Sequence, residues 1–321
     1  GLMASTNLAL LQHYKTKLRE IYKITDLGPI DGHTHLGMEV THRRDDSIVH
    51  ISADAKVTTM LRRHGLTGVR KSEVPATPDS YHYEKAKLET SPPYDLRSFL
   101  GSCAFLADSC RPDITTITSV LASSVDWNAV RPADYDAGIR LAGYLRHAAP
   151  KSGLRYDGSG FRTVEEALLP RLLVDSDFNR SGDCKSRSGY VVFLANAPVI
   201  WASKRQSIVA TSSTEAEVVA ISEACKSVVW LRSFLTELGF NLPPSPVFID
   251  NKSAKMLAAD LVSSSKSRHI APRFFWTRQL KDLGILDFKD VDTLDNVADV
   301  FTKLCKVTTQ TRFIKRLIAS P

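Results

Sequence analysis

Four acidic residues in the second half of the chain stand where a carboxylate could take part in phosphoester chemistry. Asp175 and Asp250 each close a short apolar run of the kind that is typical of a buried strand. Glu217 falls in the first turn of a long predicted helix, and Asp299 falls in the last predicted helix. Because ligand sites of α/β sheets gather at strand ends, these carboxylates are placed to converge.

Hydrolysis of a phosphodiester at neutral pH requires an activated water and neutralisation of charge on the leaving oxygen. Two divalent ions about 4 Å apart can supply both. Magnesium prefers hard oxygen ligands, so a set of Asp and Glu side chains can bind it without His or Cys. We therefore expect two Mg²⁺ ions at this site, with Mn²⁺ able to substitute.

Each acid also has a purely structural alternative. The spacing of residues 212–215 and of residues 214–217 fits a capping box, in which Glu reaches back to the start of its helix. Asp250 could cap the following helix, and Asp299 could be a solvated helix residue. Spacing alone favours the structural role for each acid taken singly, so the catalytic prediction depends on the whole set.

The elements that must position these acids follow from periodicity. Apolar or alternating runs predict strands at 172–175, 190–194, 199–202, 247–250 and 286–291. Helical spacing predicts helices at 214–238, 253–260, 272–283 and 295–303. This order describes an α/β domain with a mixed sheet.

The first half of the chain has a more helical texture. Helices are predicted at 8–24, 53–64, 96–107, 114–125 and 135–147, with a hairpin formed by 35–42 and 47–52. Prolines in residues 70–93 predict a loop. We place one domain at 1–155, a linker at 156–167 and a second domain at 168–321.

Composition limits the function classes. The chain has 321 residues, a net charge of +7 and 43% hydrophobic residues, which fits a globular protein that could bind a polyanion. Its five cysteines include no C-x-x-C pair, which argues against a disulfide framework or a cysteine-rich zinc site. No apolar run approaches the roughly 18 residues of a membrane span, and no signal peptide is visible, so we expect an intracellular protein.

Several ordered blocks carry a resemblance to a known family. They are VDSDFNRSGDCKSRSGYVVFLANAPVIWASKRQ at 174–206, SSTEAE at 212–217, IDNKSA at 249–254, SRHI at 267–270 and NVADVFTK at 296–303. Together they resemble the ribonuclease H domain of copia-type LTR retrotransposon polyproteins. The first half resembles the reverse transcriptase of the same polyproteins, downstream of its active-site strand. Its blocks are ITDLG at 24–28, HLGMEV at 35–40, YDLRSFLGS at 94–102 and RPDI at 111–114.

The resemblance implies a ribonuclease H-like mixed five-stranded sheet flanked by helices. A mostly helical α+β remnant of the reverse transcriptase thumb and connection would precede this sheet. It implies an endonuclease that cuts the RNA strand of RNA–DNA hybrids during reverse transcription, in a cytoplasmic particle or the nucleus. The remainder of the polyprotein would be a partner. The polymerase motif Tyr-x-Asp-Asp is absent, so we expect no polymerase activity.

The same resemblance assigns roles to residues. Asp175, Glu217, Asp250 and Asp299 match the four metal ligands, and Glu215 is the less favoured acid of the long helix. Leu304 and Cys305 replace the usual Pro-Leu, which puts the orientation of the C-terminal helix in question. Basic residues that could contact phosphates are Lys204, Arg205, Lys252, Lys255, Arg268 and Arg273, although a solvated surface is the better account of any one of them taken singly.

Two other functions remain open. A degenerate copy could keep the fold and bind nucleic acid without cutting it. More remotely, Asp31, His33 and His35 form an Asp-x-His-x-His pattern like the zinc-binding start of amidohydrolase barrels.

Overall fold

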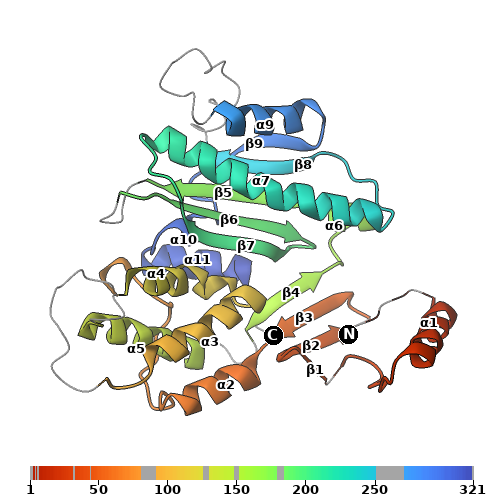
Figure 1. Ribbon diagram of the computed structural model, residues 1–321, viewed down its shortest axis with the longest axis horizontal. Coiled ribbons are helices and arrows are strands. Elements are labelled where there is room, and N and C mark those ends of the chain that lie inside the picture. The colour runs from red at the N-terminus through yellow and green to blue at the C-terminus, as the bar shows by residue number, and fades with distance from the viewer. Residues whose placement is uncertain are drawn as a thin grey trace.

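The computed structural model describes residues 3, 5, 7–31, 33–43, 45–80, 92–125, 130–147, 152–178, 184–250 and 271–319. Two β-sheets organise these residues (Figure 1). One sheet belongs to the first half of the chain and the other to the second half, and helices cover both.

The second sheet has five strands in the order β7-β6-β5-β8-β9. Its strands are β5 (Arg171–Asp177), β6 (Arg187–Leu194), β7 (Ala197–Arg205), β8 (Ser245–Asp250) and β9 (Leu286–Val291). β5, β6 and β7 pair antiparallel, whereas β8 is parallel to both β5 and β9. The predicted mixed five-stranded sheet is therefore confirmed.

Helices cover both faces of this sheet (Figure 1). Side chains of β5 alternate between two cores, as a strand with two buried faces requires. Leu172 and Val174 pack with the long helix α7 (Ser213–Glu237) and with α9 (Ala271–Asp282). Leu173 packs on the other side with residues of α10 (Asp299–Thr302) and α11 (Val307–Leu317).

The C-terminal helices differ from the prediction. The helix expected at 295–303 is shortened to the four residues of α10, because residues 292–298 are committed to turns. Within these turns the Asn296 side chain accepts a bond from Ala298 N and donates one to Val174 O. The whole of α11 was not predicted, and the helix predicted at 253–260 lies outside the described residues.

The first sheet has four antiparallel strands in the order β1-β2-β3-β4. They are β1 (Thr34–His35), β2 (Met38–Arg43), β3 (Ile48–Ser52) and β4 (Gly153–Asp157). The predicted hairpin is confirmed as β2 and β3. The segment 156–167, which was expected to be a linker, includes the last two residues of β4 and most of the short helix α6 (Val164–Leu168).

The predicted helices of the first half are confirmed with small shifts of their ends. They are α1 (Leu8–Ile21), α2 (Asp54–Arg63), α3 (Leu96–Ser109), α4 (Thr115–Ser124) and α5 (Pro132–His147), with two short 3-10 turns at Pro78–Ser80 and Pro112–Ile114. Residues of α2 to α5 share one core, while α1 has no buried residue and stands apart in Figure 1. No helix among the described residues is long and apolar enough to span a membrane.

The two halves of the chain are packed against each other. Helix α4 is the main contact: Thr116 Oγ1 donates to Val300 O of α10 over 2.5 Å, and Ser119 Oγ donates to Ser203 O of β7 over 2.8 Å. The indole of Trp201 on β7 donates to Ala107 O of α3 over 2.8 Å. Helices α3 and α4 of the first half thus pack against β7 and α10 of the second half.

Candidate active site

Two of the predicted acids end neighbouring parallel strands. Asp175 lies near the end of β5 and Asp250 is the last residue of β8. The pairing of Leu172 with Val247 sets the register of these strands, and three residues further along each strand come the two acids. The carboxyl ends of parallel strands meet at one edge, so Asp175 and Asp250 are brought together as the sequence predicted.

Helix α7 resolves the two capping boxes that the sequence allowed. The helix begins at Ser213 with Ser212 as its N-cap, and the hydroxyl of Ser212 accepts a bond from Glu215 N. The buried Glu215 carboxylate in turn accepts bonds of 2.7 Å from the amide and the hydroxyl of Thr211. Glu215 is therefore the structural acid, and Glu217, half a turn further on, is left to face the sheet edge.

Asp175, Glu217 and Asp250 line one pocket. Its empty volume is about 210 Å³, and the remaining lining residues are Val174, Ala220, Ile221 and Ile249. These four apolar residues belong to β5, α7 and β8, and all of them are part of the core between the sheet and α7. Three acids from three separate segments thus open onto the same space.

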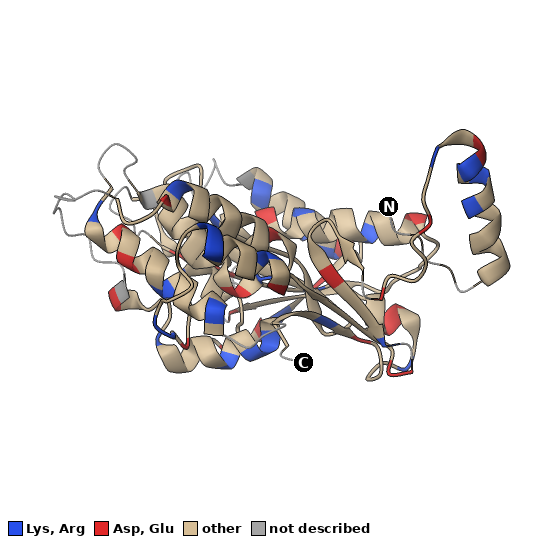
Figure 2. Ribbon diagram, turned by 90° about the horizontal axis from the view of Figure 1, so that it is seen from below, with Lys and Arg blue, Asp and Glu red and all other residues tan. Residues whose placement is uncertain are grey.

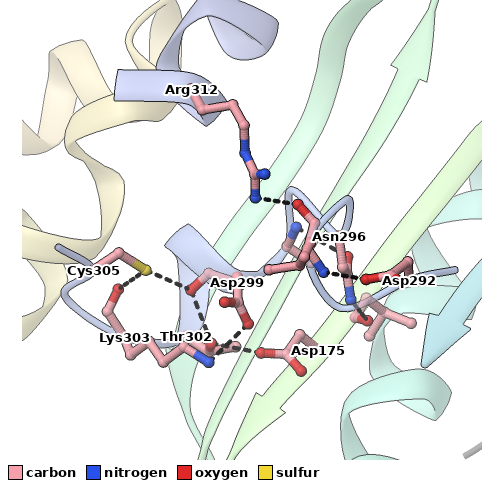
Figure 3. Close-up of polar contacts among 11 residues, drawn as sticks. Asp175, Asp292, Asn296, Asp299, Thr302, Lys303, Cys305 and Arg312 are labelled. Carbon is pink, nitrogen blue, oxygen red and sulfur yellow. Dashed lines mark hydrogen bonds and ion pairs between the residues drawn. The ribbon is translucent and has the colours of Figure 1, made fainter. Parts of the chain in front are cut away.

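The fourth predicted acid, Asp299, stands beside Asp175 at the start of α10 (Figure 3). Thr302 Oγ1 donates to Asp175 Oδ2 over 2.7 Å and also contacts Asp299 O at 3.0 Å. Lys303 Nζ forms an ion pair with Asp299 Oδ1 at 2.8 Å. Helix α10 and its C-cap residue therefore bring an acid, a hydroxyl and an ammonium to the end of β5.

A glycine allows α10 to approach the sheet this closely. Gly189 of β6 pairs with Asp175 across the strands. A Cβ atom at Gly189 would lie 2.6 Å from Thr302 Cγ2 and 2.7 Å from the carbonyl carbon of Phe301. A side chain at this position would push α10, and Asp299 with it, away from Asp175.

The acids and the lysine at this end of β5 shift one another's pKa. Burial is the main reason why the pKa of Asp175 is raised to about 7, and the Asp299 charge acts in the same direction. The Thr302 hydrogen bond and the Lys303 charge oppose this rise. Burial alone would lower the pKa of Lys303, but its bond to Asp299 and the charges of both acids outweigh burial, so that pKa lies above its usual value.

The donor set fits hard divalent ions. Among the residues that the structure describes, no three His, Cys, Asp or Glu side chains already stand close enough to hold a metal. However, Asp175, Glu217 and Asp250 share a pocket, and Asp299 adds a carboxylate beside Asp175. Carboxylate oxygens of this kind are the ligands that Mg²⁺ prefers.

Two of the predicted phosphate-contacting residues lie at the same end of the sheet. Lys204 and Arg205 are exposed at the end of β7, and Ser188 on β6 pairs with both Lys204 and Ser176. Lys204 is therefore two strands, or roughly 10 Å, from the residue that follows Asp175. Arg273 lies on α9, while Lys252, Lys255 and Arg268 fall outside the described residues. Figure 2 shows basic and acidic residues interspersed along the ribbon in that view.

The zinc alternative gains no support. His33 is exposed before the edge strand β1, and His35 lies on that strand. The Asp31 carboxylate accepts a 2.6 Å bond from His42 N, which is a structural role. The surrounding sheet is antiparallel, whereas an amidohydrolase barrel needs parallel strands.

Sequence reasoning did not find the supporting residues Gly189, Thr302 and Lys303. Thr302 and Lys303 belong to the NVADVFTK block that carried the resemblance, so the block itself was the signal. Gly189 offered no comparable signal, because its role depends on a helix more than a hundred residues later in the chain.

No protein-family model matches the chain. It is 27% identical over 323 aligned residues to the "Retrovirus-related Pol polyprotein from transposon TNT 1-94" of Nicotiana tabacum, covering 94% of this chain and 22% of the relative. It is also 27% identical over 318 residues to the corresponding polyprotein from transposon RE1 of Arabidopsis thaliana, covering 98% of this chain and 21% of the relative.

A shorter relative, "Secreted RxLR effector protein 161" of Plasmopara viticola, is 34% identical over 137 residues, which are 42% of this chain and 89% of that protein. The chain spans about a fifth of the length of the two polyproteins. The resemblance to copia-type retrotransposon polyproteins is confirmed, since the chain is homologous along nearly its whole length to one portion of the Pol polyproteins of such transposons.

Proposed function

We propose that the chain carries a ribonuclease H that hydrolyses the RNA strand of RNA–DNA hybrids as part of a retrotransposon polyprotein. The observation that carries this proposal is the shared pocket of Asp175, Glu217 and Asp250, with Asp299 beside Asp175. The mixed five-stranded sheet is compatible with the ribonuclease H-like fold that the resemblance implies.

Asp175 and Asp250 end adjacent strands and are the acids best placed to share two divalent ions, with Mg²⁺ as the expected metal. Glu217 lines the same pocket from α7 and would hold one ion and help to place the scissile phosphate. Asp299 would complete the second set of ligands from α10. When bound, the ions supply an activated water and neutralise charge on the leaving oxygen.

The protein would recognise the hybrid mainly through its backbone and groove shape, with little base specificity. Lys204 and Arg205 are exposed at the sheet end that carries Asp175, where they can meet phosphates flanking the cleavage point. Neutralisation of phosphates by these side chains would make binding fall with rising salt.

The test is cleavage of a labelled RNA–DNA hybrid with and without Mg²⁺, beside a double-stranded DNA control. The wild-type chain should degrade only the RNA strand and only with Mg²⁺. Asp250→Asn should fold normally and lose cleavage. Asp290→Asn is the matched control, because Asp290 is an exposed acid on the adjacent strand β9, where it pairs with Ile249.

The outcomes separate the functional alternatives. Cleavage by Asp250→Asn at the wild-type rate would refute the assignment of the site. Hybrid binding without cleavage by the wild-type chain would mean a folded but inactive nucleic-acid-binding remnant. Activity that needs Zn²⁺ and is lost in His33→Ala would mean the amidohydrolase.

A further inference from the structure

The ion pair between Lys303 and Asp299 joins a cation to an acid that the proposed function assigns to a metal. Asp299 is the first residue of α10 and Lys303 is its C-cap, four positions later, and Nζ of Lys303 lies 2.8 Å from Oδ1 of Asp299. The side chain of Asp299 is only 13% exposed and that of Lys303 is 31% exposed, so solvent screens this pair less than a surface pair. The Lys303 charge also attracts the Asp175 carboxylate.

The backbone around this pair is held in place, while the lysine side chain keeps a route to solvent. Thr302 fixes α10 to β5 through its bond to Asp175, and Lys303 N donates to Asp299 O over 3.2 Å. Figure 3 shows the Lys303 side chain running back along the helix to reach Asp299. Rotation about its side-chain bonds would release the carboxylate without moving the helix.

An ammonium and a divalent ion draw on the same negative charge. A positive charge about 3 Å from Asp299 lowers the local negative potential that would attract a second cation. A divalent ion beside Asp299 would in turn repel the ammonium. The two cations therefore compete for Asp299 rather than assist each other.

We infer that Lys303 is a built-in counter-ion that holds the Asp299 carboxylate in the metal-free protein and that a divalent ion must displace it. This inference rests on the proposed function, because it assigns Asp299 to the metal site. It makes Lys303 a positioning residue, which sets the affinity for metal and keeps α10 in place before metal arrives.

The test measures binding of Mn²⁺ to the full chain by electron paramagnetic resonance of the free ion, without nucleic acid. Lys303→Gln should bind the ion at the Asp299 site roughly tenfold more tightly than wild type, because the competing charge is gone. Without metal, Lys303→Gln should unfold at a lower temperature than wild type, and Mn²⁺ should raise its unfolding temperature by a larger increment.

Two variants control for unspecific effects. Lys306→Gln removes the same charge from an exposed lysine three residues along the chain and should leave the affinity within about twofold of wild type. Lys303→Arg keeps the charge and should bind Mn²⁺ like wild type. If Lys303→Gln does not fold, Lys303→Met also removes the charge and can be used to test for tighter Mn²⁺ binding.

The outcomes distinguish this inference from the proposed function. Equal affinities in Lys303→Gln and Lys306→Gln, or weaker binding in Lys303→Gln, would overturn the counter-ion role while leaving the metal site intact. Failure of every chain, wild type included, to bind Mn²⁺ would overturn the metal site itself, and the proposed function with it.

Discussion

Thr302 donates a hydrogen bond from its Oγ1 to Oδ2 of Asp175 across 2.7 Å, and this contact joins residues 127 positions apart in the chain. It ties the short helix α10 to the strand end where the acids converge. Because Asn296 also donates to Val174 O, two consecutive residues of β5 are bonded to the C-terminal segment.

Replacing Thr302 by Val keeps the shape of the side chain and removes the bond to Asp175. We expect the free energy of unfolding to fall by about 1 kcal/mol, as for a typical hydrogen bond. Because the bond favours the ionised carboxyl, its loss should also raise the pKa of Asp175 further. Urea denaturation and carboxyl NMR titration measure the two effects. The control is Thr308→Val on the exposed side of α11, which should change neither quantity.

The contribution of Asp175 to the stability of the metal-free protein should decrease as pH rises from about 4 to about 7. The pKa of Asp175 is raised to about 7 in the folded chain from an ordinary value of 3.8. Within this window the folded state holds a proton that the unfolded state has lost, so rising pH favours unfolding. After allowance for solvent at the partly exposed carboxyl, the loss should be on the order of 2 kcal/mol.

Denaturant unfolding at several pH values measures this dependence. Asp175→Asn has no such proton to lose and should show a flatter profile over the same range. The difference in stability between wild type and Asp175→Asn should therefore change in favour of the variant as pH rises from 4 to 7. A wild-type profile that Asp175→Asn reproduces would contradict the environment assigned to Asp175.

Gly189→Ala tests the close approach of α10 to the sheet. The new methyl group would stand 2.6 Å from Thr302 Cγ2 and 2.7 Å from the Phe301 backbone, so the helix must move. We expect the free energy of unfolding to fall by about 1–3 kcal/mol, which is typical of an overpacked site. Under conditions where the variant is fully folded, hybrid cleavage should still be at least tenfold slower than in wild type.

The matched control is Gly101→Ala. Gly101 lies within α3, and a Cβ atom there meets nothing within 4 Å. Because alanine is the better helix former, this change should stabilise the chain by up to about 1 kcal/mol and leave cleavage unchanged. Normal cleavage by folded Gly189→Ala would show that α10 does not position the site.

The strand ends of the site could be predicted from the sequence because each is a local pattern. Short apolar runs that end in Asp175 and Asp250 indicate buried strands, and the parallel pairing of β5 with β8 places the two acids side by side. Glu217 and Glu215 could not be separated by spacing, since both fit a capping box. Their distinction depends on the N-cap being Ser212, which only the folded chain shows.

The remaining differences arise from contacts between distant segments. β4 was missed because it is a short run, Gly153–Asp157, whose partner β3 lies about a hundred residues earlier. The helix at 295–303 was predicted too long because Asn296 uses its side chain to bond Val174 O and Ala298 N. The roles of Thr302 and Lys303 likewise depend on where α10 docks, which no local pattern reveals.

The contact between α4 and α10 predicts that the first half of the chain helps to position the candidate site. Thr116 Oγ1 donates to Val300 O, the residue after Asp299. Thr116→Val would leave that carbonyl without this donor, so we expect about 1–2 kcal/mol lower stability and several-fold slower hybrid cleavage under conditions where the variant is fully folded.

Thr118→Val is the matched control, because the Thr118 hydroxyl is buried on the same helix and has no hydrogen-bond partner among the described residues. Its removal should be neutral or stabilising and leave cleavage unchanged. Cleavage by Thr116→Val at the rate of Thr118→Val, measured beside urea denaturation of both chains, would mean that α4 supports the fold without influencing Asp299.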